Sequence, residues 1–304
     1  MRAVVGIDLG GTKVAAAPLR DRSLGESAVR PTELSSGAAL LDQLVEIVDE
    51  VRGDPLDAVG IGVPSVVDFA TGRVVSSVNI PLDDLPLRSV LGQRLGVPVF
   101  VDNDATVAAL AEAHDERLRL VAHNLVMLTL GTGFGGGLVL GGRIYRGATG
   151  AAAEVGHTLV AVDVHDGVPP PVSFPQPGSI ESLAAGRALD RLAQSIGIEN
   201  GVAAVEAAEA GDQRAVAVIE RWAQRVGIAI ANAINMFDPD EVVLGGGAAR
   251  AGELLLGPAR RVATGYVLPG VGRRTTVRLA RHGVRAGVLG AALLAVHELG
   301  GAGV

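Results

Sequence analysis

Three glycine-rich turns, each directly after an apolar run that predicts a β-strand, constrain this chain more than any other feature. They are DLGGTK at residues 8–13, LGTGFGGG at residues 130–137 and LGGGAARAG at residues 244–252. Glycine permits positive φ and lets backbone N–H groups approach phosphate oxygens without a Cβ in the way. One such turn alone is more often a plain hairpin, but three together favour phosphate-binding turns. None has the Walker A or dinucleotide-binding spacing.

The first two turns belong to an internal repeat. Shifted by 121 positions, LVMLTLGTGFGGGLVL lies over VVGIDLGGTKVAAAPL, so that Gly131 falls on Gly10, Gly133 on Thr12 and Thr129 on Asp8. Both segments predict a strand, a glycine turn and a second strand. The repeat therefore predicts two similar α/β halves that face each other, with a ligand in the cleft between them.

The remaining elements are predicted from hydrophobic periodicity and turn signals. Buried strands are expected in AVGIGV, PVFVDND and EVVLG. Helices are expected at 38–51, 87–95, just beyond residue 104, and at 180–195, 216–237 and 285–299, with one more opening at the third glycine turn.

We expect two domains. The first spans residues 1–120 and is completed by a C-terminal helix at 285–304. The second spans 121–284 and contains a site loop at 154–182 and the nucleotide turn at 244–252. A chain of 304 residues with 48% hydrophobic residues can bury two cores of ordinary size.

Composition excludes several classes of protein. The chain has no cysteine, which excludes disulfides, thiolate metal sites and thiol nucleophiles. A net charge of −7 argues against a nucleic acid partner. No apolar run reaches the roughly 18 residues that span a bilayer, and an aspartate at position 8 argues against a signal peptide. We therefore expect a cytoplasmic protein without a membrane partner.

Polar residues stand at positions suited to acid–base chemistry and sugar binding. Asn103 and Asp104 end a predicted strand just before a helix, where open α/β sheets carry reactive groups. Asp104 could accept a proton from an alcohol, although it could equally be only a helix N-cap. Glu154 and His157, three positions apart, could grip a polyhydroxy ligand together with Glu181. No metal-ligand spacing is present around the histidines.

Lys13 is the one lysine among 26 basic residues, and it lies inside the first glycine turn. A compact ammonium suits a phosphate there, and chance explains the count equally well.

These stretches resemble the ROK-family sugar kinases. The resemblance covers almost the whole chain and rests on GIDLGGTK, IGVPSVVD, VDNDATVAALAEA, LGTGFGGGLVLGGRIYRGATGAAAEVGH, GSIES and VLGGG. It implies an α/β fold of two ribonuclease-H-like (actin-like) domains with an interdomain cleft, as in the sugar kinase–Hsp70–actin superfamily. It also implies ATP and Mg²⁺ as cofactors and a homodimer.

The resemblance implies a role for each matching residue. The first phosphate turn would be Asp8, Gly10, Gly11, Thr12 and Lys13, with Asp8 holding Mg²⁺ through water. The second phosphate turn would be Gly131, Thr132 and Gly133, and the adenosine side would be Gly245, Gly246 and Gly247. Asp104 would be the general base, and the sugar ligands would be Asn79, Asn103, Asp104, Glu154, His157 and Glu181.

The chain departs from the family pattern twice. The family's cysteine block, which binds a structural zinc with the histidine, is reduced to PGSIES, where Gly178 and Glu181 match and Ser179 replaces the last cysteine. No zinc site is therefore expected, and the prolines of the loop are expected to order it. In GVPS, Ser65 replaces a glycine, which could alter the choice of hexose.

The predicted function is ATP-dependent phosphorylation of the primary (6-) hydroxyl of glucose or a close relative. A kinase for an amino sugar or another modified hexose is the first alternative. A sugar-sensing regulator is a second, although its helix-turn-helix would precede the first glycine turn, which here begins at residue 8. A sugar- or nucleotide-binding protein without catalysis is a third, and the presence of Asp8 and Asp104 argues against it.

Overall fold

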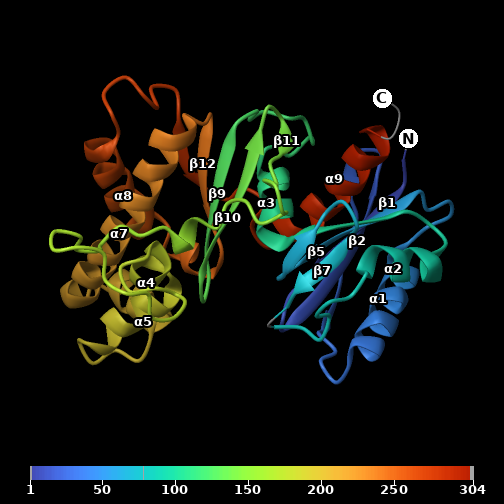
Figure 1. Ribbon diagram of the computed structural model, residues 1–304, viewed down its shortest axis with the longest axis horizontal. Helices are drawn as coiled ribbons and strands as arrows, with labels where there is room; N and C mark the ends of the chain where they lie inside the picture. The colour runs from blue at the N-terminus through green and yellow to red at the C-terminus, as the bar shows by residue number, and fades with distance from the viewer. Residues whose placement is uncertain (1, 78, 302–304) are drawn as a thin grey trace. The chain divides into compact units, whose positions relative to one another are not determined.

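The computed structural model describes residues 2–77 and 79–301. The chain forms two compact units, and Figure 1 labels many of their helices and strands. Unit 1 consists of residues 1–123, 137–152 and 281–304, and unit 2 consists of residues 124–136 and 153–280. The domain limits predicted from the sequence, near residues 120 and 284, stay a prediction.

The first sheet of the protein begins with the predicted hairpin. Strands β1 (Val4–Leu9) and β2 (Lys13–Arg20) pair antiparallel, with Leu9 opposite Val14. The sheet order is β3-β2-β1-β5-β8, and β4 also pairs with β2. The other strands are β3 (Ser23–Leu24), β4 (Ala28–Pro31), β5 (Ala58–Val63) and β8 (Val99–Asn103), and a separate pair is formed by β6 (Val66–Asp68) and β7 (Arg73–Ser76).

The two faces of this sheet differ because its residues alternate. Aliphatic residues such as Val5, Ile7 and Ile61 face a core shared with α1 (Gly37–Val51) and α2 (Leu87–Leu95). Gly6 and Gly60 lie on the other face, where α9 (Ala286–Gly301) packs on β1, β5 and α3 (Asp104–Glu112). A Cβ at either glycine would overlap a carbonyl of α9. The small residues therefore allow this helix to approach the sheet closely.

Helix α9 is also long and apolar enough to be a candidate membrane span by its length and composition, over Gly283–Gly300. Half of that window is buried inside the protein. Leu294 and Ala295 are fully buried, and the helix packs on the first sheet as just described. In this structure α9 is therefore a core helix of unit 1.

The second sheet repeats the strand order of the first. It runs β11-β10-β9-β12-β13, so that an antiparallel hairpin is again followed by two parallel strands. The strands are β9 (Leu125–Leu130), β10 (Phe134–Leu140), β11 (Arg143–Ile144), β12 (Glu241–Gly245) and β13 (Thr276–Leu279). The predicted repeat is thus present in the topology as well as in the sequence.

The helices of unit 2 correct two predictions. The single helix expected at 180–195 is two helices, because Ala185 has an extended ψ of 169° and the N–H of Gly186 donates to the Gly131 carbonyl. The third glycine turn opens the short 3₁₀ helix η2 (Gly247–Ala251) before an α-helix begins. The α-helices are α4 (Ile180–Ala184), α5 (Gly186–Gln194), α6 (Gly201–Glu209), α7 (Gln213–Phe237) and α8 (Glu253–Tyr266).

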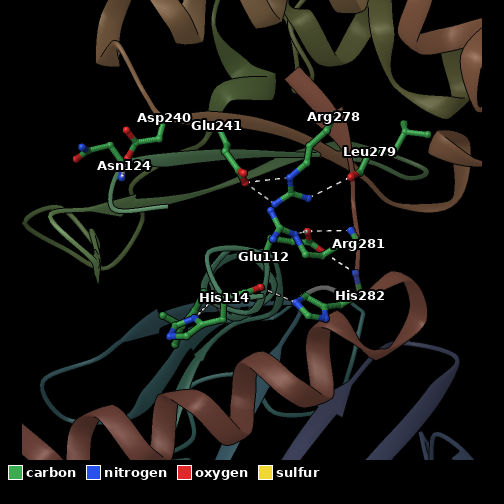
Figure 2. Close-up of polar contacts among 10 residues, drawn as sticks. Glu112, His114, Asn124, Asp240, Glu241, Arg278, Leu279, Arg281 and His282 are labelled. Carbon is green, nitrogen blue, oxygen red and sulfur yellow. Dashed lines mark hydrogen bonds and ion pairs between the residues drawn. The ribbon is translucent and has the colours of Figure 1, made fainter. Parts of the chain in front are cut away.

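Charged side chains anchor the chain before and after the end of β13 (Figure 2). Within unit 2, Arg278 Nη2 donates to Glu241 Oε2 at 2.5 Å. Within unit 1, the fully buried carboxylate of Glu112 accepts the N–H groups of Arg281 and His282, each at 2.9 Å. Because an unpaired buried carboxylate is costly, these bonds define the backbone path into the 3₁₀ helix η3 (Gly283–Arg285) and α9.

Candidate functional site

The first glycine turn is a tight hairpin at the end of β1. The N–H of Gly10 donates to the Lys13 carbonyl at 2.9 Å, and Thr32 Oγ1 donates to the Gly10 carbonyl at 2.7 Å. Thr12 and Lys13 are exposed. A Cβ at Gly11 would lie 3.3 Å from the Asn79 Cβ, so this turn lies beside a predicted sugar ligand. The turn offers backbone N–H groups and a cation together, as a phosphate site requires.

Asp8 lies at the same end of β1, against the first turn of α9. Burial raises the pKa of its carboxyl above the ordinary value, and the charge of Lys13 opposes the rise. A Cβ at Gly287 would overlap the Asp8 carboxylate, so this glycine leaves the space beside it open. Mg²⁺ prefers oxygen ligands and keeps several waters, which is compatible with a single carboxylate and the phosphates of a nucleotide. Asp8 therefore fits the predicted water-mediated magnesium ligand.

Asn103 and Asp104 follow β8 directly, and the structure distinguishes their local roles. Asn103 is the N-cap of α3, because its Oδ1 accepts the N–H groups of Ala105 at 2.9 Å and Thr106 at 3.2 Å. Asp104 is the first residue of the helix and is half-buried, and its Oδ1 accepts the Ala105 N–H at 2.7 Å. The N-cap of α3 is therefore Asn103 rather than Asp104, and the role of Asp104 as a base stays a prediction.

Ser65 lies beneath Asn103 in unit 1. The Asn103 amide donates to the Ser65 carbonyl at 3.4 Å, which orients the amide. The buried Ser65 hydroxyl donates to Ser77 Oγ at 3.0 Å, and Ser77 in turn donates to the Ile80 carbonyl. The hydroxyl of Ser65, which stands where the family usually has glycine, thus takes part in an internal hydrogen-bond chain. Its effect on the choice of hexose stays a prediction.

The second glycine turn, at the end of β9, is joined to a predicted sugar ligand. The N–H of Gly131 donates to the Gly133 carbonyl at 3.0 Å, which closes the turn. Glu181 Oε2 accepts the N–H of Phe134 at 2.8 Å, and a Cβ at Gly133 would lie 2.6 Å from the same oxygen. Glu181 is therefore bonded directly to this turn, and only glycine at position 133 leaves room for its carboxylate.

Glu154 is the N-cap and His157 the last residue of a short 3₁₀ helix, η1 (Val155–His157), in the same unit. Glu154 Oε2 lies 3.8 Å from His157 Nε2, and both side chains are partly exposed. The ring of Phe174 meets the His157 ring edge-on, with centroids 5.5 Å apart. The predicted pairing of Glu154 with His157 is thus compatible with the structure, and Phe174 is an additional aromatic neighbour.

The cysteine-free loop is ordered by backbone pairing between its two ends. The N–H groups of Val160 and Ala161 donate to the Gly178 carbonyl at 2.9 and 3.0 Å, and the N–H of Ile180 donates to the Thr158 carbonyl at 3.0 Å. Gly178 has φ +81°. The fully buried Ser179 caps α4 through its hydroxyl. The prolines were expected to order the loop, whereas hydrogen bonds at its base bring Glu181 back toward His157.

The second and third glycine turns meet at one cavity in unit 2. Gly246 has φ +82°, and a Cβ there would lie 2.5 Å from the Leu130 carbonyl, so the third turn packs against the end of β9. The cavity has a volume of about 780 Å³. Its lining includes Gly131, Thr132, Gly186, Arg187, Asp190, Val202, Val205, Glu206, Gly247 and Ala248. Both the size and the glycine-rich wall suit a nucleotide.

The structure sorts the predicted site residues into two groups. In unit 1 the first turn lies beside Asn79, and Ser65 is bonded to Asn103, the neighbour of Asp104. In unit 2 the second turn lies beside the third turn and beside Glu181. Sequence reasoning missed the cavity wall from α5 and α6, including Arg187 and Asp190. Asn200, whose side chain caps α6, is a start signal that could have identified this helix.

Two repeated α/β halves with glycine turns at strand ends define the class of the protein. It has the ribonuclease-H-like (actin-like) fold of the sugar kinase–Hsp70–actin superfamily, as predicted. The chain matches the model of the ROK family over residues 4–298 and belongs to that family. The predicted resemblance is therefore confirmed.

Relatives and solved structures of similar length accompany this match. A glucokinase of Halalkalibacterium halodurans is 33% identical over 317 residues, which cover 94% of this chain and 92% of the relative. An N-acetyl-D-glucosamine kinase of Vibrio parahaemolyticus is 33% identical over 300 residues, covering 95% and 98%. A ROK family glucokinase from Streptomyces griseus, in complex with glucose and AMPPNP, is 30% identical with a TM-score of 0.78 and covers 97% of this chain and 99% of its own.

Proposed function

We propose that this protein is an ATP-dependent hexose kinase that phosphorylates the primary 6-hydroxyl of glucose or a closely related hexose. The observation that carries the proposal is the position of Asp104, a half-buried carboxylate on the first residue of α3, beside the Asn103 cap. Asp104 accepts the proton of the sugar hydroxyl as its oxygen attacks the γ-phosphorus. The bond to the β,γ-bridging oxygen breaks, and ADP leaves with the electron pair.

The donor is ATP, for which the unit 2 cavity offers the nucleotide site. Residues of the second and third glycine turns, Thr132 among them, line it, and α5 begins there at Gly186. A helix N-terminus favours the negative charge of phosphates. Asp8 would hold Mg²⁺ through water, and the ion would neutralise charge on the β- and γ-phosphates. Lys13 adds a positive charge in the first turn.

The sugar ligands are the residues that the family pattern assigns, namely Asn79, Asn103, Asp104, Glu154, His157 and Glu181. An N-acetylated amino sugar is the second candidate acceptor, because a relative named N-acetyl-D-glucosamine kinase matches this chain as closely in identity as the glucokinase does. Turnover rates with different sugars are therefore needed to identify the acceptor.

The test measures ADP release with ATP, Mg²⁺ and a panel of hexoses that includes glucose, mannose and their N-acetylated amines. Asp104→Asn should lower kcat by about 10²–10⁴-fold, the usual contribution of a general base. Asp42→Asn, at an exposed aspartate that pairs with Arg94, is the matched control and should leave kcat unchanged. Absence of turnover with every sugar, or an Asp104→Asn enzyme as fast as wild type, would refute the proposal.

We further propose that the protein is a cytoplasmic homodimer without structural zinc. The chain has no cysteine with which to form the family's zinc block. Light scattering of the purified protein tests the dimer. Metal analysis tests the loop, because one tightly bound zinc per chain would contradict an ordering of the loop by backbone pairing alone.

A further inference from the structure

An ion network in unit 1, built around the buried carboxylate of Asp102, lies next to the proposed base. Arg146, which follows β11, donates from Nε to Asp102 Oδ2 at 2.7 Å and from Nη2 to Glu298 Oε1 at 3.1 Å. Its guanidinium carbon lies 3.4 Å from the centre of the Phe69 ring. Asp102 is 2% exposed. Arg146 therefore joins the end of β8, the last turns of α9 and an aromatic ring.

The same carboxylate reaches the backbone of the proposed site. Asp102 Oδ1 accepts the N–H of Asn103 at 2.9 Å, while its other oxygen accepts from Arg146. Asn103 caps α3, and Asp104 is the first residue of that helix. One buried carboxylate thus connects the arginine to the Asp102–Asn103 peptide, which leads directly into Asn103 and Asp104. Burial raises the pKa of Asp102, and the Arg146 charge opposes the rise, so the arginine favours the ionised acceptor.

The segment that carries Arg146 is itself fixed in unit 1. The Arg146 carbonyl accepts the N–H of Ala152 at 3.1 Å. Gly150, at φ +85°, passes so close to β6 that a Cβ would overlap the Val67 carbonyl. A guanidinium that contacts Asp102, Glu298 of α9 and Phe69, on a segment fixed by these backbone contacts, is a rigid partner. A rigid partner suits a group that must hold geometry within a fraction of an ångström.

We propose that Arg146 is a positioning residue of the phosphoryl-transfer site, which acts through Asp102 to set the direction of the Asp102–Asn103 peptide, and through it the start of α3 and the Asp104 carboxylate. This inference rests on the hexose kinase function proposed above. It assigns to Arg146 no contact with substrate. Its effect should therefore appear in kcat, whereas nucleotide affinity, which depends on the unit 2 cavity, should not change.

The experiment first measures wild type and Asp104→Asn, so that failure of the proposed function is recognised by itself. Arg146→Met, Arg146→Lys and Glu298→Gln are then compared, with Arg73→Met as the control, because Arg73 forms an exposed pair with Asp84. Rates are expressed per folded molecule, determined from near-UV circular dichroism. We expect Arg146→Met to lower kcat at least tenfold with KM for ATP within twofold of wild type. Arg146→Lys should recover part of the loss, and Arg73→Met should equal wild type.

A double variant separates positioning from a merely structural role. If Arg146 acts through Asp104, Arg146→Met in the Asp104→Asn background should lower the residual rate less than twofold, because the affected group is already absent. An equal fold-loss in both backgrounds, or an unchanged kcat per folded molecule, would overturn the proposal. Should Arg146→Met not fold, Glu298→Gln gives the same comparison with a smaller expected loss of about threefold, and no loss there or in Arg146→Lys would also overturn it.

Discussion

Glu181 accepts the backbone N–H of Phe134 at 2.8 Å, so the residue that ends the cysteine-free loop is bonded directly to the second glycine turn. The proposed sugar ligand and the proposed phosphate turn are therefore mechanically joined within unit 2. A change at either position should be detected at the other, and this coupling can be tested by substitution.

Replacing Glu181 should separate its two roles. Glu181→Ala leaves the N–H of the buried Phe134 without its acceptor, which should cost about 1–3 kcal/mol of unfolding free energy and also weaken sugar binding. Glu181→Gln retains an acceptor oxygen, so stability should stay near wild type while KM for the sugar rises. Urea unfolding and steady-state kinetics measure the two quantities. Glu220→Ala, at an exposed ion pair on α7, is the control, and equal effects of Gln and Ala on stability would contradict the coupling.

Gly287 tests the space beside Asp8. Because a Cβ at this position would overlap the Asp8 carboxylate, Gly287→Ala must displace either the carboxylate or the first turn of α9. We expect kcat to fall at least tenfold and half-maximal activity to need more Mg²⁺. Gly265→Ala, in α8, adds the same methyl group where no atom lies within 4 Å, and it should leave activity unchanged. Magnesium titrations of ADP release provide the measurement, and an unchanged Mg²⁺ requirement would argue against Asp8 as the magnesium ligand.

The pKa of Asp8 predicts a conflict between stability and activity. Burial raises this pKa above 3.8, so the folded state binds more protons than the unfolded state within the window between the two values. Stability therefore falls as pH rises from about 3.8 through the raised pKa, and the loss persists at pH 7. Asp8→Asn should unfold at a higher temperature than wild type at pH 7, and this difference should shrink toward pH 3.

The control for this prediction is Asp42→Asn, an exposed aspartate for which no such gain is expected. The Asp8→Asn enzyme should lose at least tenfold in kcat, because stabilising substitutions at functional sites commonly lower activity. A melting temperature of Asp8→Asn at or below that of wild type at pH 7 would show that the carboxylate is not destabilised by burial.

The elements that were predicted correctly from the sequence are those that local residue patterns determine. The β1–β2 hairpin, whose turn is closed by a bond between Gly10 and Lys13, was predicted from its glycines and alternating residues, as were α1 and α2. The repeat at Gly131 correctly predicted the second hairpin, and the matching strand order follows from it.

Contacts between distant residues were not predictable in this way. The helix expected at 180–195 is interrupted because the Gly131 carbonyl takes the N–H of Gly186, and nothing near residue 186 signals that partner. Likewise the bond from Arg146 to Asp102 joins two segments whose sequences show no complementary pattern. The site residues themselves were identified through their family pattern rather than through periodicity, and their roles remain predictions for the experiments above.

The loop that lacks cysteine gives a last prediction, at Gly178. This residue has φ +81°, and a Cβ would lie 2.5 Å from the Ala161 carbonyl, which belongs to the opposite end of the loop. Gly178→Ala should therefore break the backbone pairing at the loop base and displace Glu181, raising KM for the sugar several-fold. Gly167→Ala is the control, because Gly167 also has positive φ, at +111°, but open space around it. If this variant keeps the wild-type KM, backbone strain alone does not explain an increase at Gly178→Ala. Sugar KM for both variants, with Tm for each, decides the matter: a Gly178→Ala enzyme with the KM of Gly167→Ala would mean that the pairing does not position Glu181.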